Sequence, residues 1–253
     1  MAGEKSVRYG KIRAISRSRA SLDIPSLTID RRGVDKSAIP GKTIYRLSIY
    51  HRCLSRLAEN NIETVSSSAL AKAAGVNPSQ LRRDLTYLGQ FGTRGLGYSV
   101  QELIEAIREV LGREQLQPVI LVGAGNLGVA LLRYKGFQKE GFEVVAAFDA
   151  LPDAVKKRGI SVPVYHVDTV RKFVIENDVK LAILTVPVEH SQEVTNELVD
   201  AGVQGLLSFS PTVLQVPESV TVNSVDLALE LEQVSFFVKS EKPLVDTDEP
   251  LAP

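Results

Sequence analysis

Apolar residues along residues 40–58 recur at steps of three and four, the spacing that places them on one face of a helix. The positions that keep this spacing are Ile44, Leu47, Tyr50 or His51, Leu54, and Leu57 or Ala58. A shorter helix is predicted at 66–74, with Gly75 as its C-terminal stop. A third begins after Asn77, a good N-cap, with Pro78 in the first helical position. Helix, short helix, glycine-containing turn and helix is the order of a helix-turn-helix.

The segment that follows, residues 90–98, is rich in glycine and is predicted to form the tip of a hairpin. Ser99 and Glu102 then make a capping box, which predicts a helix that runs to about Leu111. We expect this helix, within residues 99–117, to link the first module to the rest of the chain.

Beyond Pro118 the pattern alternates between short apolar runs and helical spacing. The predicted strands are 118–123, 142–148, 162–166, 180–186 and 204–209. The predicted helices are 126–139, 168–177, 190–201 and 224–239. Strand, helix and strand at this spacing predict a parallel, doubly wound α/β sheet.

Composition adds a division of charge to this picture. Hydrophobic residues make up 44% and charged residues 24% of the 253 residues, as in an ordinary globular protein with room for two domains. The net charge is zero, but residues 1–97 hold 17 Lys and Arg against 7 Asp and Glu, whereas residues 98–253 hold 13 against 23. A basic half joined to an acidic half is typical of a nucleic-acid-binding module fused to a domain with another task. A chance imbalance of solvated faces is the alternative.

The ends of the chain and its single cysteine bear on where the protein works. Residues 1–37 are rich in Arg and Ser and are expected to be a disordered basic extension, although a transit peptide is the alternative. Residues 241–253 are expected to be a disordered acidic tail. No stretch approaches the ~20 apolar residues of a membrane helix. Cys53 has no partner for an internal disulfide, so we expect a cytoplasmic protein with no membrane contact.

The third helix is the candidate DNA-reading element. Leu81, Leu85 and Leu88 share one face and should dock the helix on its neighbours. The residues then left for base edges and phosphates are Ser79, Gln80, Arg82, Arg83 and Thr86. Asp84 is expected to orient one guanidinium of the arginine pair. Arg94, at the glycine-rich tip, is placed to enter a minor groove. A plain amphipathic helix with a solvated basic face is the alternative.

A glycine-rich turn follows the first strand of the second module. Its residues are Gly123, Ala124, Gly125, Asn126, Leu127 and Gly128. The glycines permit a tight turn, a close approach of backbone to a pyrophosphate, and close packing of helix on strand. Asp149 ends the next strand 21 residues further on, where a carboxylate accepts from a ribose 2′-hydroxyl and repels a 2′-phosphate. This pattern predicts NADH or NAD as the ligand, with coenzyme A as an alternative.

The fourth strand ends in Thr185, Val186 and Pro187, at the edge where such sheets bind ligands, so these three residues join the candidate cofactor site. The groups that a dehydrogenase needs are missing. The three histidines are scattered, and no Ser/His/Asp set, Cys/His metal spacing or carboxylate pair is present. We therefore expect neither a catalytic nor a metal site, and no enzyme activity.

Taken together, these motifs resemble those of the Rex redox-sensing transcriptional repressors of bacteria, from about Ile39 to Val238. The resemblance includes the helix Leu81-Arg-Arg-Asp-Leu-Thr-Tyr-Leu-Gly89 and the segment Gly92-Thr-Arg-Gly-Leu-Gly-Tyr98. It continues through Val65-Ser-Ser-Ser68, Val122-Gly-Ala-Gly-Asn-Leu-Gly128, Tyr134-Lys-Gly-Phe137, Ala147-Phe-Asp149, Thr185-Val-Pro187 and Asn223-Ser-Val-Asp-Leu227.

The resemblance implies a homodimer in which a winged-helix domain, residues 38–98, is joined to a Rossmann domain, residues 118–223. The C-terminal helix, residues 224–240, would be swapped between subunits. Such proteins bind an inverted-repeat operator when NADH is scarce. They release it when NADH closes the dimer and moves the recognition helices off their half-sites. An NAD-dependent oxidoreductase or a coenzyme A-binding protein with a helical appendage remains the alternative.

The resemblance also assigns roles to residues. Arg82 and Arg83 would touch the operator, and Arg94 would do so from the wing. Tyr134 would hydrogen-bond Asp226 of the partner subunit, and Arg52 would compete for that carboxylate in the DNA-bound form.

Three positions depart from the family pattern. Leu227 stands where members carry a Phe that lies near the nicotinamide. Ser208 and Ser210 stand where Asn and Ala are common.

Overall fold

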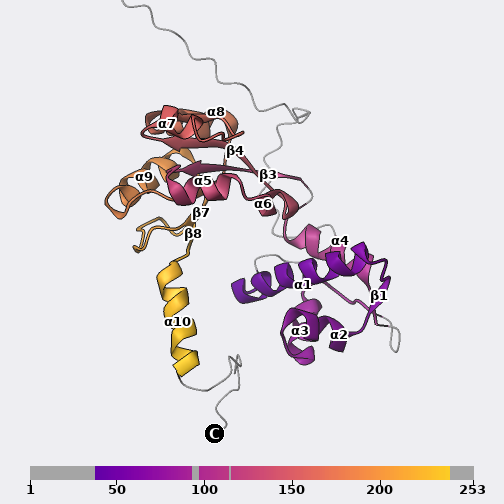
Figure 1. Ribbon diagram of the computed structural model, residues 1–253. Helices are drawn as coiled ribbons and strands as arrows, with labels where there is room; N and C mark the ends of the chain where they lie inside the picture. The colour runs from indigo at the N-terminus through magenta and orange to yellow at the C-terminus, as the bar shows by residue number, and fades with distance from the viewer. Residues whose placement is uncertain (1–37, 93–96, 114, 240–253) are drawn as a thin grey trace, which may run out of the picture. The chain divides into compact units, whose positions relative to one another are not determined.

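The computed structural model describes residues 38–92, 97–113 and 115–239, and the chain divides into two compact units between Leu116 and Gln117 (Figure 1). Each unit has its own apolar core. The predicted extension 1–37, the tail 241–253 and the wing residue Arg94 lie outside the described residues. No helix in the described ranges is long and apolar enough to cross a membrane.

The N-terminal unit is a helix-turn-helix with a short antiparallel ribbon. Its elements are α1 (Gly41–Glu59), β1 (Thr64–Val65), α2 (Ser67–Ala74), α3 (Pro78–Thr86), β2 (Tyr98–Ser99) and α4 (Val100–Val110). β1 pairs antiparallel with β2, with Thr64 opposite Ser99 and Val65 opposite Tyr98. The three predicted helices of this unit are confirmed.

Local hydrogen bonds explain where these helices begin and end. The side chain of Ser66 accepts from the backbone N–H of Ala69 at 3.1 Å and caps α2. Gly75 ends α2 with φ 69°, a left-handed conformation that glycine adopts at little cost. The side chain of Asn77 accepts from the N–H of Ser79 at 2.8 Å and caps α3. These caps agree with the sequence prediction.

The helix predicted to link the two modules is instead part of the N-terminal core. α4 packs against α1, and its buried residues are Val100, Leu103, Ile104, Ala106, Ile107 and Val110. They join Leu47, Tyr50 and Leu54 of α1 and Leu81 and Leu85 of α3 in one cluster. A spacer between domains would expose this apolar face to water, so the capping box begins a structural helix of the first unit rather than a separate linker.

The C-terminal unit is a six-stranded parallel sheet in the order β5-β4-β3-β6-β7-β8. The strands are β3 (Gln117–Val122), β4 (Phe142–Asp149), β5 (Val164–His166), β6 (Leu181–Leu184), β7 (Gly205–Ser208) and β8 (Thr221–Ser224). The chain builds outward from β3 through β4 to β5, and then from β6 to β8 on the other side. The strand order thus reverses between β3 and β6, which is where doubly wound sheets bind ligands.

Helices cover both faces of this sheet (Figure 1). On one face lie α8 (Val170–Asn177), preceded by the 3-10 turn Val167–Thr169, and α9 (Val188–Ala201). On the other lie α5 (Asn126–Leu132), α6 (Gly136–Lys139) and α7 (Pro152–Lys156). The chain continues after β8 into α10 (Leu227–Lys239).

The structure differs from the predicted elements in four respects. The helix predicted at 126–139 is interrupted, so that α5 and α6 are separate. The strand β8 was not predicted because its residues are polar and mostly exposed, without the alternation of a half-buried strand. The short helix α7 was also missed. The last helix begins at Leu227 rather than 224, since residues 221–224 form β8.

Candidate functional sites

The α3 helix presents a polar, basic surface. Leu81 and Leu85 are buried, whereas Ser79, Arg82, Arg83 and Thr86 are exposed, as predicted from helical spacing. Arg82 Nη1 donates to Ser67 Oγ at 3.4 Å and its Nη2 to Ser79 Oγ at 3.3 Å, so its guanidinium lies over the start of both α2 and α3. The exposed donors are of the types that bind phosphates and the edges of guanine.

Gln80 is half-buried and already engaged within the unit. Its Nε2 donates to Asp84 Oδ1 at 2.9 Å, and its Oε1 accepts from Arg83 Nη1 at 3.5 Å. The predicted DNA contact by Gln80 would therefore require its amide to leave Asp84, while Arg83 has only a long, weak contact to give up.

The expectation that Asp84 orients one of the two arginines was wrong. Asp84 is 1% exposed and pairs with Arg46 of α1, whose Nε and Nη2 donate to the two carboxylate oxygens at 2.7 and 2.8 Å. Tyr50 Oη donates to Oδ2 at 2.7 Å and Thr43 Oγ1 to Oδ1 at 3.4 Å. The carboxylate thus fixes the recognition helix on α1 rather than arranging its outer face.

Burial opposes ionisation of Asp84, but the hydrogen bonds from Arg46, Tyr50 and Gln80 outweigh it and lower the pKa of the carboxyl below its ordinary value. Burial, and then the hydrogen bond to Asp84, raise the pKa of Tyr50. Asp84 is therefore a carboxylate and Tyr50 a neutral donor at neutral pH. The sequence does carry a signal for this cluster, because Thr43, Arg46 and Tyr50 fall on one face of α1 at steps of three and four.

The glycine-rich turn joins β3 to α5 at the reversal of strand order. Gly123 has φ 93°, and a Cβ there would lie 2.7 Å from the backbone of Thr185. A Cβ at Gly128 would collide with the carbonyl oxygen of Gly123. At Gly125 the same Cβ would meet nothing within 4 Å, so the turn is open on that side. The outer glycines therefore serve packing, and the middle one leaves room for a ligand to approach the backbone.

Asp149 connects this turn to the end of β4. Its Oδ2 accepts from the N–H of Ala124 at 2.7 Å and its Oδ1 from the N–H of Leu151 at 2.8 Å. A carboxylate oxygen has two lone pairs, so both oxygens keep capacity to accept from ribose hydroxyls. The hydrogen bond from Ala124 places the acid beside the glycine-rich turn, where its spacing in the sequence predicts it. The side chains of Asn126 and Leu127 are exposed at the same turn.

The segment after β6 lies against the glycine-rich turn. The N–H of Thr185 donates to Val122 O at 2.9 Å, and its Oγ1 donates to Gly123 O at 2.5 Å. Thr185 and Val186 are half-buried, and Pro187 is exposed at the N-cap of α9. Residues predicted from two distant parts of the sequence therefore meet at one edge of the sheet.

A buried hydroxyl follows the neighbouring strand, β7. Ser208 Oγ accepts from the N–H of Ser210 at 3.2 Å. Ser210 is 2% exposed, and among the described residues its Oγ has no hydrogen-bond partner. A buried hydroxyl without a partner is costly, so it is suited to a polar group of a ligand. With the open glycine turn and Asp149, these residues fit a dinucleotide.

The four residues that the resemblance places in a state-dependent interface lie on different elements. Arg52 is exposed on α1, and Tyr134 is 60% exposed between α5 and α6. Asp226 Oδ1 accepts from the N–H groups of Ala228 and Leu229 at 2.9 and 3.3 Å, so Asp226 caps α10. Leu227 is 62% exposed.

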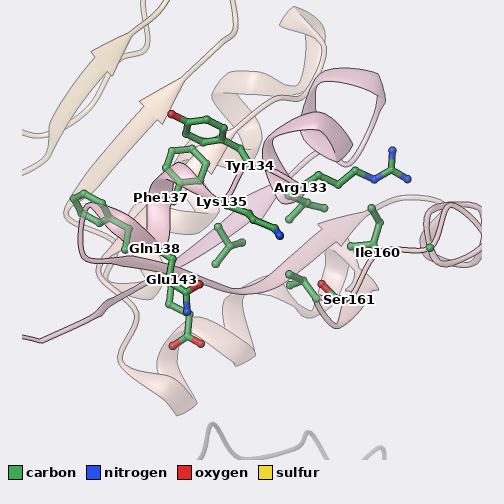
Figure 2. A pocket seen from close by; sticks show the side chains of 13 residues that line it. Arg133, Tyr134, Lys135, Phe137, Gln138, Glu143, Ile160 and Ser161 are labelled. Atoms are coloured by element: carbon green, nitrogen blue, oxygen red, sulfur yellow. The ribbon is translucent and has the colours of Figure 1, made fainter. Parts of the chain in front are cut away.

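Tyr134 also borders a cavity of about 500 Å³ at the amino ends of β4 and β5 (Figure 2). Its ring meets that of Phe137 edge-on, with centroids 5.2 Å apart. The cavity lies at the C-terminal end of α5, whereas the glycine-rich turn lies at the N-terminal end of that helix. It is therefore separate from the candidate dinucleotide site. No group of three or more His, Cys, Asp or Glu that could hold a metal occurs in the described ranges.

Comparison with known proteins gives two family matches and several close relatives. A family model described as "Putative DNA-binding protein N-terminus" matches residues 38–86, and one described as "CoA binding domain" matches residues 114–212. The chain is 46% identical to the redox-sensing transcriptional repressor Rex of Streptomyces coelicolor over 198 residues, 78% of this chain and 77% of the relative.

Two solved structures are also similar to this chain over most of its length. The crystal structure of RSP in complex with beta-NAD+ and operator DNA matches with a TM-score of 0.74 and 36% identity, over 80% of this chain and 94% of that one. The structure of RSP in complex with beta-NADH matches with a TM-score of 0.71 and 35% identity, over 81% and 96%.

Proposed function

Because the chain belongs to the Rex family of redox-sensing transcriptional repressors, we propose that it binds operator DNA as a homodimer and releases it on binding NADH. The observation that carries this proposal is the presence in one chain of an α3 helix with an exposed basic face and a glycine-rich turn paired with Asp149. The first supplies a grip on DNA, and the second supplies the site of the effector.

DNA binding is assigned to α3 and the wing. Arg82 and Arg83 would contact the operator, with Ser79 and Thr86 beside them on the exposed face. Arg94 would reach a minor groove from the wing. Two α3 helices, one from each subunit, would read the two halves of an inverted repeat, since the symmetry of such a site mirrors that of a dimer.

The cofactor site is assigned to the carboxyl edge of the sheet. The backbone at Gly125, Asn126 and Leu127 would hold the pyrophosphate, and Asp149 would accept from the adenosine ribose and repel a 2′-phosphate. Thr185, Val186 and Pro187 would border the nicotinamide half, with the Ser210 hydroxyl as an added hydrogen-bonding group. The chemistry of NADH relevant here is its redox state, which the protein reads and does not change.

The homodimer is supported by apolar surface that a single chain exposes. The apolar side chains of α10 that are between 51% and 76% exposed are Leu227, Leu229, Leu231, Val234, Phe236 and Val238. A hollow of about 600 Å³ also opens on the sheet face formed by β3, β6, β7 and β8, lined in part by Leu181 and Leu207. Surface of this kind marks a protein interface. In the dimer, Tyr134 would hydrogen-bond Asp226 of the partner subunit, and Arg52 would compete for that carboxylate.

The protein is a repressor and not an enzyme, in keeping with its relatives' names. Among these comparisons, coenzyme A appears only in the description of the family model that matches residues 114–212. We place its action in the cytoplasm, where a bacterial repressor meets DNA.

The proposal is tested by selecting a palindromic site from random duplexes and measuring gel retardation while NADH, NAD, NADPH and coenzyme A are titrated separately. Release by NADH at concentrations at which NADPH and coenzyme A have no effect supports it. Retardation that is indifferent to NADH, or that responds to coenzyme A instead, would overturn it.

A further inference from the structure

Arg158, which belongs to no motif of the sequence, reaches the glycine-rich turn from the segment after α7. Its Nη1 donates to Gly125 O at 3.3 Å, and its Nη2 donates to Asn126 Oδ1 at 3.0 Å. The two contacts hold the guanidinium at the part of the turn where the backbone is open to a ligand. Arg158 is 32 residues from Asn126 in sequence, so no local motif reveals this contact.

The backbone of Arg158 is also held in place. Its N–H donates to Val155 O at 2.9 Å, and its carbonyl oxygen accepts from Arg133 Nη2 at 2.6 Å. Arg133 is the C-cap of α5, and Asn126 is the first residue of that helix. The side chains of Arg133 and Arg158 together therefore connect the C-terminal end of α5 to its first residue. Figure 2 shows Arg133 pointing away from Tyr134, consistent with a separate task for its guanidinium.

Arg158 is exposed, so its charge is available to an anionic ligand at the turn. No Asp or Glu of the described residues forms an ion pair with Arg158. Its two contacts at the turn are to neutral oxygen atoms, the carbonyl of Gly125 and the side-chain amide of Asn126, and neither offsets its charge. The guanidinium carries more N–H donors than its two contacts use, so it can bind an oxyanion without leaving the turn.

We propose that Arg158 is a further cofactor-binding residue that contacts the pyrophosphate of the dinucleotide. The inference rests on the proposed NADH site and adds a charged residue to it. The contacts favour the pyrophosphate over a 2′-phosphate, because Gly125 and Asn126 belong to the part of the turn that approaches the pyrophosphate. The 2′-hydroxyl of the adenosine ribose is assigned instead to Asp149, whose carboxylate accepts hydrogen bonds from the N–H groups of Ala124 and Leu151.

The test compares Arg158→Ala and Arg158→Gln with wild type and with Lys157→Ala, an exposed neighbouring cation on the same turn. NADH, NADPH, ADP and adenosine are titrated calorimetrically into the full-length protein. Loss of a charge-assisted contact should weaken NADH and ADP about tenfold in both Arg158 variants and leave adenosine unchanged. The salt dependence of NADH binding should also fall, and Lys157→Ala should match wild type.

Wild-type affinity of Arg158→Ala for NADH and ADP would overturn the inference. So would a variant whose only change is in NADPH binding, since that outcome assigns the guanidinium to a 2′-phosphate. Arg158→Gln keeps an amide donor for Asn126 without the charge, so it separates loss of charge from loosening of the turn. If wild type itself fails to bind NADH, the proposed function fails, which this experiment distinguishes from failure at Arg158 alone.

Discussion

Arg46 of α1 and Asp84 of α3 form a two-point ion pair, at 2.7 and 2.8 Å, in which the aspartate side chain is 1% exposed and the arginine side chain 19% exposed. The pair crosses 38 residues of sequence and joins the helix proposed to read DNA to the helix that supports it. Tyr50 and Thr43, which also lie on α1, donate further hydrogen bonds to the same carboxylate. A buried carboxylate in such a pair sets the rotation of α3 about its own axis, and with it the direction in which Arg82 and Arg83 point.

Replacing Arg46 by Met should destabilise the protein strongly, because Asp84 would remain buried without its cation. The expected loss is about 3 kcal/mol in the free energy of unfolding. It is measured by urea denaturation, followed with a signal that reports unfolding of the N-terminal unit. Arg56→Met, at an exposed arginine of the same helix, is the matched control and should lie within about 0.5 kcal/mol of wild type. Equal stability of the Arg46 and Arg56 variants would contradict the role of the pair.

The same pair predicts the pH dependence of stability. The pKa of Asp84 is lowered in the folded state from an ordinary value of 3.8. A carboxyl with a depressed folded pKa contributes stability above its unfolded pKa and loses it as pH falls through the folded pKa. Stability should therefore drop below about pH 4. Asp84→Asn should flatten that acid limb, as followed by urea midpoints between neutral and acid pH. An unchanged slope would show that other carboxylates dominate it.

Arg82→Ala should weaken operator binding by about 1–3 kcal/mol if the guanidinium reads a base, and should relax specificity at one position of each half-site. Fluorescence anisotropy with matched and mismatched duplexes measures both effects. Arg56→Ala also removes one positive charge, but from α1 rather than α3, so it controls for the change in net charge. A loss that is the same for all duplexes would assign Arg82 to a phosphate instead.

Asp149→Ala should weaken NADH and admit NADPH, because the carboxylate that accepts from the ribose and repels a 2′-phosphate is removed. We expect a loss of about tenfold for NADH, read from titrations of both cofactors. The variant also frees the N–H groups of Ala124 and Leu151, so its melting temperature without ligand must be recorded beside wild type. An unaltered preference between the two cofactors would refute the specificity role.

Gly136→Ala should impair communication between the two sites while leaving each site intact. A Cβ at Gly136 would overlap the ring of Tyr134, an exposed side chain that can swing away, so the fold should tolerate it. Tyr134 would then lose its position beside Phe137 and its proposed contact with Asp226 of the partner subunit. The ratio of operator affinities with and without NADH should fall about tenfold, with NADH affinity in the absence of DNA unchanged.

Gly41→Ala is the control for this variant, because a Cβ there meets nothing within 4 Å. If Gly136→Ala retains the full wild-type ratio, the position of the Tyr134 ring does not carry the coupling.

Features set by short-range rules were predictable from the sequence. The caps at Ser66 and Asn77, the glycine-rich turn and the distance to Asp149 each depend on residues within one or two elements. The edge strand β8 was not, because its residues are polar and its existence depends on the hydrogen bonds offered by β7. The assignment of α4 to a core depends likewise on the surface of α1, which no local pattern describes.

The candidate sites show the same division. Helical periodicity gave the exposed positions of α3, but not the hydrogen bond that holds Gln80 on Asp84 or the partner of Asp84 on another helix. At the candidate dinucleotide site, the motif identified the turn and its acid, whereas Arg158 comes from a separate segment. Contacts between side chains distant in sequence depend on how the elements pack.

The most direct test of the account is whether DNA and NADH binding are coupled reciprocally. The affinity for a selected operator duplex is measured with and without saturating NADH, and the affinity for NADH is measured with and without the duplex. Our account predicts that each ligand weakens the other by the same factor, roughly 5- to 150-fold. Operator affinity that is unchanged by saturating NADH would contradict it.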